Sequence, residues 1–420
     1  MSGVTIADKA AWLGDPALQK LLAVLSTSDE TARIAGGAVR NAILEKPVAD
    51  IDVATTNLPA QVIERAEAAG FRAVPTGIEH GTVTVIADGR PFEVTTLRAD
   101  VETDGRHAKV VFGRDWRADA ERRDFTINAL YAGADGTVVD LVGGLADLQA
   151  RTVRFIGDAE MRIREDYLRI LRFFRFFAWY GAGRPDADGL KACARLKGGL
   201  ERLSAERVWA ELRKLLSAAD PSRALLWMRQ ASVLTTILPE SEKWGIDAIH
   251  GLVAAERELH WPADPLLRLA AIVPPDVRRI EAMAARLRMS TAEAERLSQW
   301  ASATPLAADA TELLARQKLY RHYGTGLSDR LKLALAGARS RAVNDNAALI
   351  EAAGFARLLK VAEAWRRPAL PVTGKDLIEL GMQEGPLLGE RLKSLESAWL
   401  DSGFQLGRDA LLERAAKMDR

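Results

Sequence analysis

The stretch ARIAGGAVR at residues 32–40, together with DID at residues 50–52, decides the fold that this sequence predicts. The short apolar run ends in two glycines, Gly36 and Gly37, which is typical of a strand that enters a tight turn. The residues after the glycines have the apolar spacing of a helix. The first turn of that helix would present free backbone N–H groups and the guanidinium of Arg40, and together these favour an anion such as a phosphate.

Two aspartates follow on what we expect to be the next strand, residues 48–54. Because side chains alternate across a strand, Asp50 and Asp52 would project from one face and Ile51 from the other. Two close carboxylates repel each other, and Mg²⁺ is commonly held by one or two carboxylates plus substrate phosphates. A glycine turn or an Asp-x-Asp pair alone is a weak signal, but the two together predict nucleotidyl transfer.

A third carboxylate is a candidate for the same site. Residues 82–86 and 92–97 are alternating strands on either side of an Asp-Gly turn, which predicts a β-hairpin. If the second of these strands lies beside the strand of Asp52, Glu93 would be a further catalytic carboxylate. A solvent-facing glutamate explains the same position equally well.

Strand and helix patterns alternate up to about residue 145, and from Gly157 onward there is almost no strand signal. Within the first region, we expect a polar loop at residues 103–117 and a helix at residues 118–132. The change predicts an α/β head of roughly 145 residues, followed by a separate helical remainder.

The composition sets broad limits. A chain of 420 residues exceeds what one hydrophobic core usually supports, and 48% hydrophobic with 27% charged residues is ordinary for a globular protein. The net charge of +1 says little about partners. We expect no membrane span and no signal peptide. The single cysteine, Cys193, excludes an intramolecular disulfide. A cytoplasmic location fits both this and the expected lack of a signal peptide.

A second constellation lies in the predicted helix at residues 165–176. Asp166, Arg169, Arg172 and Arg175 recur at every third position beside an aromatic stripe. One interpretation is a ladder of ion pairs within the helix. The other is base reading: a carboxylate only accepts hydrogen bonds and a guanidinium only donates them. One such pair would accept cytosine and adenine, which place an amine donor beside a ring-nitrogen acceptor, and would reject uracil and guanine.

From Ile34 to about Leu216 the chain resembles the class II CCA-adding enzymes, tRNA nucleotidyltransferases whose polymerase-beta-like head is shared with bacterial poly(A) polymerases. Several ordered motifs carry the resemblance. They are GGAVR at 36–40, DID at 50–52, RRDFTINA at 122–129, DLVGG at 140–144, EDYLR at 165–169 and SAERVW at 204–209.

The resemblance implies an α+β fold, in which a head with a mixed sheet precedes an all-helical neck, body and tail. The catalytic head would span residues 1–145. A helical neck at 146–216 would recognise the base, and the body and tail at 217–420 would bind tRNA. The implied substrates are CTP and ATP, and the implied cofactor is Mg²⁺.

The resemblance also implies roles for individual residues. Asp50 and Asp52 would hold the metal ion. The residues implied to bind the nucleotide are Gly36, Gly37, Arg40, Arg123, Asp124, Asp166, Arg169, Arg172 and Arg175.

Two positions depart from the family pattern, because Asn41 stands where an aspartate is common and Tyr167 where a proline is common. Neither removes an atom that the chemistry needs. No histidine is followed by aspartate, so a metal-dependent phosphohydrolase module of the kind found in some relatives is not indicated.

The sequence therefore predicts an Mg²⁺-dependent enzyme that adds CCA to the 3′ end of tRNA without a nucleic-acid template. A poly(A) polymerase or an enzyme that adds only A is the nearest alternative. A non-catalytic RNA-binding relative is disfavoured by the intact Asp50 and Asp52. A nucleotide-hydrolysing regulator would need a water-activating module that the sequence does not indicate.

Overall fold

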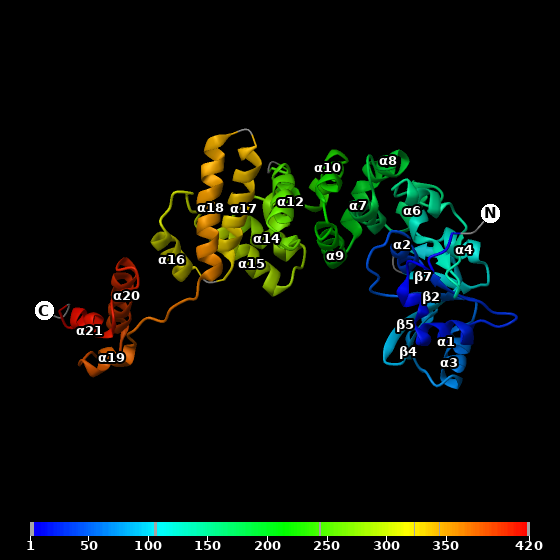
Figure 1. Cartoon of the computed structure of the whole chain (residues 1–420), viewed down its shortest axis with the longest axis horizontal. Helices are drawn as coiled ribbons and strands as arrows, with labels where there is room; N and C mark the ends of the chain where they lie inside the picture. Colours follow the sequence, from blue (N-terminus) through cyan, green and yellow to red (C-terminus); the bar gives the residue numbers. More distant parts are fainter. Residues whose placement is uncertain (1–3, 105–106, 243–244, 323, 344, 418–420) are drawn as a thin grey trace. The chain divides into compact units, whose positions relative to one another are not determined.

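The computed structural model describes residues 4–104, 107–242, 245–322, 324–343 and 345–417 (Figure 1). The chain divides into two compact units, residues 1–242 and 243–420. Every described strand belongs to the first unit, and the regular structure described in the second unit is helical. The predicted α+β architecture is confirmed, whereas the boundaries of head, neck and body at residues 145 and 216 stay predictions.

The first unit is built on a mixed sheet. Its strands are β1 (Ala32–Ala35), β2 (Asp52–Thr55), β3 (Arg72–Gly77), β4 (Thr82–Ala87), β5 (Arg90–Thr96), β6 (Arg98–Asp104), β7 (His107–Phe112), β8 (Leu130–Ala132) and β9 (Val138–Asp140). Seven strands form one sheet in the order β3-β4-β5-β2-β1-β8-β9, and β6 pairs with β7. Strands β2 and β5 run parallel and the other paired strands run antiparallel.

Helices complete the first unit. They are α1 (Pro16–Leu25), α2 (Gly37–Ile43), α3 (Pro59–Ala68), α4 (Trp116–Glu121), α5 (Gly144–Gln149), α6 (Ala159–Glu165), α7 (Leu168–Tyr180), α8 (Ala187–Leu196), α9 (Ala205–Leu216), α10 (Ser222–Gln230) and α11 (Val233–Ile237). Short 3₁₀ helices span Ala11–Gly14, Ile78–His80, Thr126–Asn128, Lys197–Arg202 and Pro239–Ser241.

The helices of the second unit follow one another with short connections. They are α12 (Ala248–Glu258), α13 (Pro265–Ile272), α14 (Val277–Arg286), α15 (Thr291–Ser302), α16 (Glu312–Arg321), α17 (Gly326–Ala342), α18 (Asn346–Ala364), α19 (Gly374–Glu379), α20 (Pro386–Asp401) and α21 (Arg408–Lys417). Helices α17 and α18 lie side by side (Figure 1) and enclose a leucine-rich core between them and their neighbours.

Local sequence signals explain where several elements begin. Asp15 accepts hydrogen bonds from the N–H groups of Ala17 and Leu18 at the start of α1, and Asp115 caps α4 in the same way. Asp158 caps α6 by accepting from the N–H of Met161. Such a cap contributes about 1 kcal/mol to helix stability. The predicted hairpin of β4 and β5 is confirmed, and both residues of its Asp-Gly turn have positive φ, which suits the twist of paired strands.

An aromatic cluster fixes α7 against the segment that follows the head. Phe173 of α7 stacks on Phe155 with ring centroids 5.5 Å apart, and Phe176 lies 5.2 Å from Phe125. Phe125 and Phe173 are fully buried, and burying a side chain of this size contributes roughly 1.5–3 kcal/mol. Because Phe125 directly follows Asp124, this packing also sets the position of a predicted site residue.

Three local predictions differ from the structure. Strand β2 begins at Asp52, so Asp50 precedes the strand instead of lying within it. The segment predicted as a loop at 103–117 contains the end of β6, β7 and the start of α4, because two strands can pair through their backbones even where the sequence is charged and contains glycine. The segment predicted as a helix at 118–132 leaves α4 after Glu121 and becomes β8, because burial in the sheet overrides the helical spacing.

In the part of the chain that the structure describes, no helix is both long and apolar enough to cross a membrane. Cys193 is buried in α8. Burial raises the pKa of its thiol, so the group is kept neutral and unreactive.

The second unit contains a buried ion pair that gives a stability prediction. The guanidinium of Arg268 donates to Glu256 at 2.6 Å, and each residue is less than 5% exposed. We expect Glu256→Ala to destabilise the second unit by about 3–5 kcal/mol, because a buried cation loses its carboxylate. Glu258→Ala is the matched control, since Glu258 forms an exposed pair with Arg339 and should cost less than about 1 kcal/mol. Urea unfolding measures both, and equal losses would contradict the prediction.

Candidate active site

A cleft of about 510 Å³ opens in the first unit and gathers residues from distant parts of the sequence. Its lining consists of Gly36, Gly37, Arg40, Asp52, Arg123, Asp124, Asn128, Asp166, Leu168, Arg169, Arg172, Phe176 and Arg207. Nine of these residues were candidates from the sequence. Asp50, Glu93 and Arg175 were also candidates but are not part of the lining, and Asn128 and Arg207 were not foreseen.

The two glycines form the turn between β1 and α2. Gly36 has a φ of 66°, and its N–H donates to the carbonyl of Leu130 at 2.8 Å. A Cβ atom at this position would lie 3.1 Å from the guanidinium of Arg123 and 3.2 Å from the carbonyl of Asn128. Glycine is therefore required here both by the backbone conformation and by the close approach of the cleft wall.

Asp52 and Glu93 are register partners on the parallel strands β2 and β5, so their side chains share one face of the sheet. The pKa of the Asp52 carboxyl is raised, first because the surrounding protein displaces water and then because Glu93 repels its charge. The charge of Asp50 raises the pKa of Asp52 by a smaller amount, whereas the charge of Arg123 lowers it. The charge of Asp52 therefore interacts with those of both Glu93 and Asp50.

In the described residues, no three His, Cys, Asp or Glu side chains are grouped so that they could hold a metal ion. The metal site predicted at Asp50 and Asp52 stays a prediction. The donor chemistry does fit a hard cation, because the groups are carboxylate oxygens that repel one another.

Arg40 of α2 is buried among neutral groups. Its guanidinium donates to the side-chain oxygens of Asn41 and Asn128 and, at 2.8 Å, to the hydroxyl of Tyr180. It also lies 4.0 Å from the centroid of the Tyr180 ring, a favourable cation–π distance. No carboxylate forms an ion pair with it in the described structure, and burial lowers its pKa. Its charge is therefore one that a bound anion would satisfy.

Asp124 links the head to α7. One carboxylate oxygen accepts from Nε of Arg172 at 2.7 Å, and the other accepts from Nδ2 of Asn128 at 2.9 Å. Burial would raise the pKa of Asp124, but the attraction of Arg172 and these hydrogen bonds outweigh it and lower the pKa. Because Asn128 in turn accepts from Arg40, a continuous network crosses the floor of the cleft.

Arg123 is held in place by a residue that the sequence analysis missed. Asp119 is almost completely buried and pairs with Arg123 at 3.2 Å and with Arg122 at 2.6 Å, and it also accepts from the hydroxyl of Tyr131 at 2.6 Å. Burial opposes ionisation, but these partners lower the pKa of Asp119 overall. A carboxylate three and four residues before two arginines in a helix was the signal that could have identified it.

The ion-pair ladder proposed for residues 166–175 does not form. Each of its four members has another partner: Asp166 pairs with Arg207, Arg169 with Glu165, Arg172 with Asp124, and Arg175 with Glu211. Asp166 is also not part of a long helix, because α6 ends at Glu165 and α7 begins at Leu168. Arg175 contacts the buried Glu211 of α9 at 2.6 Å and does not line the cleft.

Arg207 of α9 was not foreseen as a site residue. Its Nη2 donates to Oδ2 of Asp166 at 2.6 Å, and both side chains are part of the cleft lining. The only sequence signal was its place in the SAERVW motif. The pairing depends on α9 lying against α7, which spacing along the chain does not encode.

Comparisons with known proteins agree with these motifs. A family described as "Poly A polymerase head domain" matches residues 32–154, and one described as "Probable RNA and SrmB- binding site of polymerase A" matches residues 185–244. The chain is 34% identical to a human protein named "CCA tRNA nucleotidyltransferase 1, mitochondrial", over 95% of this chain and 90% of that protein. The mouse protein of the same name is 35% identical over the same shares.

A solved structure is also similar. The Bacillus stearothermophilus CCA-adding enzyme, crystallised in complex with CTP, superposes with a TM-score of 0.73 and 25% identity. The match covers 96% of this chain and 97% of that one.

The predicted cytoplasmic location is contradicted by the comparisons, because the human, mouse and zebrafish relatives are all named as mitochondrial proteins. The prediction rested on the single cysteine and on the sequence at the amino terminus. A low cysteine content does not separate one reducing compartment from another.

The opposite pKa shifts of Asp124 and Asp52 predict opposite effects on stability at pH 7. The lowered pKa of Asp124 means that its ionised form stabilises the fold above the unfolded pKa of about 4, so Asp124→Asn should be destabilised. The raised pKa of Asp52 means that its ionisation opposes folding, so Asp52→Asn should be at least as stable as the wild type without metal.

Urea unfolding at a series of pH values measures both variants against the wild type. The advantage of the wild type over Asp124→Asn should shrink as the pH falls below about 4, because the carboxylate becomes protonated. A clear loss of stability in Asp52→Asn at pH 7 would show that our account of the Asp52 carboxylate is wrong.

Proposed function

The chain belongs to the family of class II CCA-adding enzymes, and from that premise we propose how the cleft of the first unit carries out the reaction. The enzyme adds C, C and A to the 3′ end of tRNA, with CTP and ATP as substrates and no nucleic-acid template. Addition of A alone is disfavoured, because the relatives matched over most of the chain carry the CCA name.

One observation carries the proposal. A single cleft is lined by three features: the buried Arg40, which has no carboxylate partner among the described residues, Asp52 with its raised pKa, and the pair formed by Asp166 and Arg169. These three features match the three parts of an incoming nucleotide, which are the triphosphate, the reacting phosphorus and the base.

The triphosphate would lie over the turn at Gly36 and Gly37. The missing side chains let the phosphates approach the backbone closely. Arg40 and Arg123 supply positive charge from the floor and the wall of the cleft. Asp119 and the network around Asn128 hold these two guanidinium groups in position before the substrate binds, which lowers the cost of reorganisation on binding.

Asp50 and Asp52 would hold Mg²⁺, with Glu93 beside them as a third carboxylate. The mutual repulsion that contributes to the raised pKa of Asp52 is the observation that supports this assignment, because a divalent cation would relieve it. When bound, the metal would polarise the phosphoryl oxygens and favour ionisation of the attacking 3′-hydroxyl.

The base would be read by Asp166 and Arg169. Asp166 accepts from the N–H of Leu168 and from Arg207, which leaves further lone pairs on both carboxylate oxygens. Arg169 uses Nη1 for Glu165 and for the carbonyl of Arg162, and within the described part of the chain its Nε and Nη2 groups remain able to donate. The pair can therefore offer one acceptor and one donor to cytosine or adenine.

Arg172 would support the same region indirectly, since its guanidinium is paired with Asp124. Arg175 is assigned no direct contact with the nucleotide. We propose that residues 217–420 supply contacts to the tRNA, while the residues before them hold the nucleotide.

The metal assignment predicts that Asp52→Ala abolishes nucleotide addition while the first unit stays folded. The lost group is a cation ligand, and its removal also relieves repulsion from Glu93. The assay incubates the protein with tRNA that lacks its CCA end, first with CTP, then with ATP, then with both, and sequences the products. Addition at the wild-type rate by Asp52→Ala in the presence of Mg²⁺ would remove this residue from the mechanism.

The base-reading assignment predicts a loss of selectivity in Asp166→Ala. A mismatch that buries an unpaired polar group costs about 1–3 kcal/mol, so the preference for C and A over U and G should fall about 10- to 100-fold. Arg207→Gln should also reduce the preference for C and A over U and G, because Arg207 orients the carboxylate of Asp166. Single-turnover incorporation of each of the four nucleotides measures the effect.

Arg164→Gln provides the control for this experiment. Arg164 lies on the neighbouring helix α6, is exposed, pairs with Glu160 and does not line the cleft. The preference of Arg164→Gln for C and A over U and G should match that of the wild type. An unchanged preference in Asp166→Ala would eliminate the base-reading role but would leave the metal assignment intact.

A further inference from the structure

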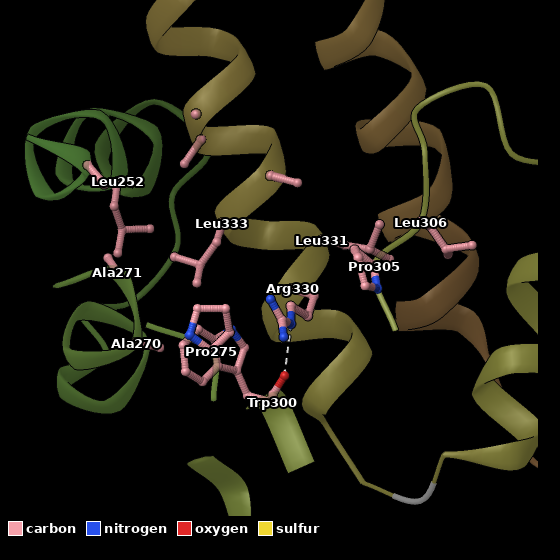
Figure 2. A pocket seen from close by; sticks show the side chains of 14 residues that line it. Leu252, Ala270, Ala271, Pro275, Trp300, Pro305, Leu306, Arg330, Leu331 and Leu333 are labelled. Atoms are coloured by element: carbon pink, nitrogen blue, oxygen red, sulfur yellow. Dashed lines mark hydrogen bonds between the residues drawn. The ribbon is translucent and has the colours of Figure 1, made fainter. Parts of the chain in front are cut away.

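A separate pocket lies within the helical second unit. It encloses about 300 Å³ and is lined by residues of α12, α13, α15 and α17 and of the segments that follow α13 and α15 (Figure 2). Most of its wall is hydrocarbon, contributed by Leu252, Ala271, Pro275, Leu306 and Leu333. An apolar cavity of about 150 Å³ is large enough to bind benzene, so this pocket can hold a larger ligand.

One wall of the pocket carries an unsatisfied donor. Trp300 of α15 is only 3% exposed, and its indole N–H has no hydrogen-bond partner in the described part of the chain. Most buried donors in folded proteins are paired, so such a group calls for an explanation. Trp365 and Trp399 also have a buried indole N–H without a partner in the described residues, so this donor alone does not identify a ligand.

The single charged residue of the pocket is Arg330 of α17. Its Nε donates to the carbonyl of Trp300 at 2.8 Å, drawn as a dashed line in Figure 2, and its Nη2 donates to the carbonyl of Ala301 at 2.9 Å. These bonds use one edge of the planar guanidinium and satisfy carbonyls in the last turn of α15. The guanidinium also lies 5.1 Å from the centroid of the Trp300 ring.

On the other edge of this guanidinium, Nη1 has no protein partner in the described structure, and Nη2 uses only one of its two N–H groups for Ala301. Among the described residues no carboxylate pairs with Arg330, and burial alone lowers its pKa. Helix capping accounts for the two hydrogen bonds that Arg330 donates to α15. It does not account for the N–H groups that remain free or for the apolar space beside them. Two parallel N–H groups on one guanidinium edge match the two oxygens of a carboxylate.

We propose that this pocket binds a small carboxylic acid with an apolar chain or ring, whose carboxylate pairs with Arg330 and whose hydrocarbon part lies among the leucines. A neutral apolar molecule would leave the cation unpaired. A nucleotide would place polar sugar and phosphate groups against a hydrocarbon wall, at a cost in desolvation. A carboxylic acid with an apolar chain pairs with the charge of Arg330 and also packs against the hydrocarbon walls.

Octanoate is a suitable probe for the full-length protein. Isothermal titration calorimetry should detect octanoate binding without tRNA or nucleotide present. Octanol lacks the charge, octylamine reverses it, and acetate lacks the apolar chain, so each should bind at least about tenfold more weakly. Equal binding of octanol and octanoate would overturn the proposal, as would no octanoate binding at millimolar concentration.

Two variants locate the site. Arg330→Gln removes the charge and should weaken octanoate binding about tenfold or more. Ala271→Leu should fill part of the pocket from α13, because Ala271 lines this pocket and its side chain would extend into the apolar space. If the first variant does not fold, the second still decides the question, because octanoate affinity unchanged by a filled pocket would exclude this site.

Arg339→Gln is the matched control. Arg339 lies on the same helix, pairs with Glu258 at the surface and does not line the pocket. The octanoate affinity of Arg339→Gln should equal that of the wild type. A loss of affinity as large as that of Arg330→Gln would show that octanoate responds to the total positive charge of α17 and not to Arg330 in this pocket. Because binding is measured without tRNA or nucleotide, failure here leaves the assignment of CCA addition untouched.

Discussion

The ion pair between Asp124 and Arg172 is the interaction on which the rest of the cleft depends. Asp124 belongs to the segment that returns to the sheet, whereas Arg172 lies on α7, which carries the base-reading side of the cleft. The aromatic packing of Phe125 and Phe173 supplies hydrophobic stabilisation at the same junction, but it has little directional preference. The ion pair adds direction, since a planar guanidinium fits a carboxylate in a restricted geometry.

The network that continues from this ion pair explains how a site for a highly charged substrate can exist before the substrate binds. Asn128 connects Asp124 to Arg40 through the two ends of its neutral amide, so the guanidinium of Arg40 is positioned without being neutralised. On the opposite side, Asp52 and Glu93 repel each other. The free protein therefore stores unfavourable electrostatic energy of both signs, and substrate phosphates with a cation would release it.

The sequence predicted most accurately what depends on local chemistry. The glycine turn and the hairpin of β4 and β5 both follow from spacing and turn preferences. The pairing of the strands of Asp52 and Glu93 was only a condition of the Glu93 hypothesis, and the structure fulfils that condition. Partner choice could not be predicted in this way. Arg169, Arg172 and Arg175 are alike in sequence, yet their partners lie four, 48 and 36 residues away. Which arginine faces the cleft is decided by the packing of α7 and α9, and local spacing does not contain that information.

Asn41 shows how a departure from the family pattern can alter the energetics without altering the geometry. An aspartate beside Arg40 would form an ion pair and cancel much of its charge before the nucleotide arrives. The amide oxygen of Asn41 accepts the same hydrogen bonds, at 3.0 and 3.1 Å, and leaves the net charge in place. The cost of burying that cation is offset in part by the ring of Tyr180, since a desolvated cation–π contact contributes about 2 kcal/mol. Asn41 therefore keeps Arg40 oriented while leaving more of its positive charge available to an anionic substrate.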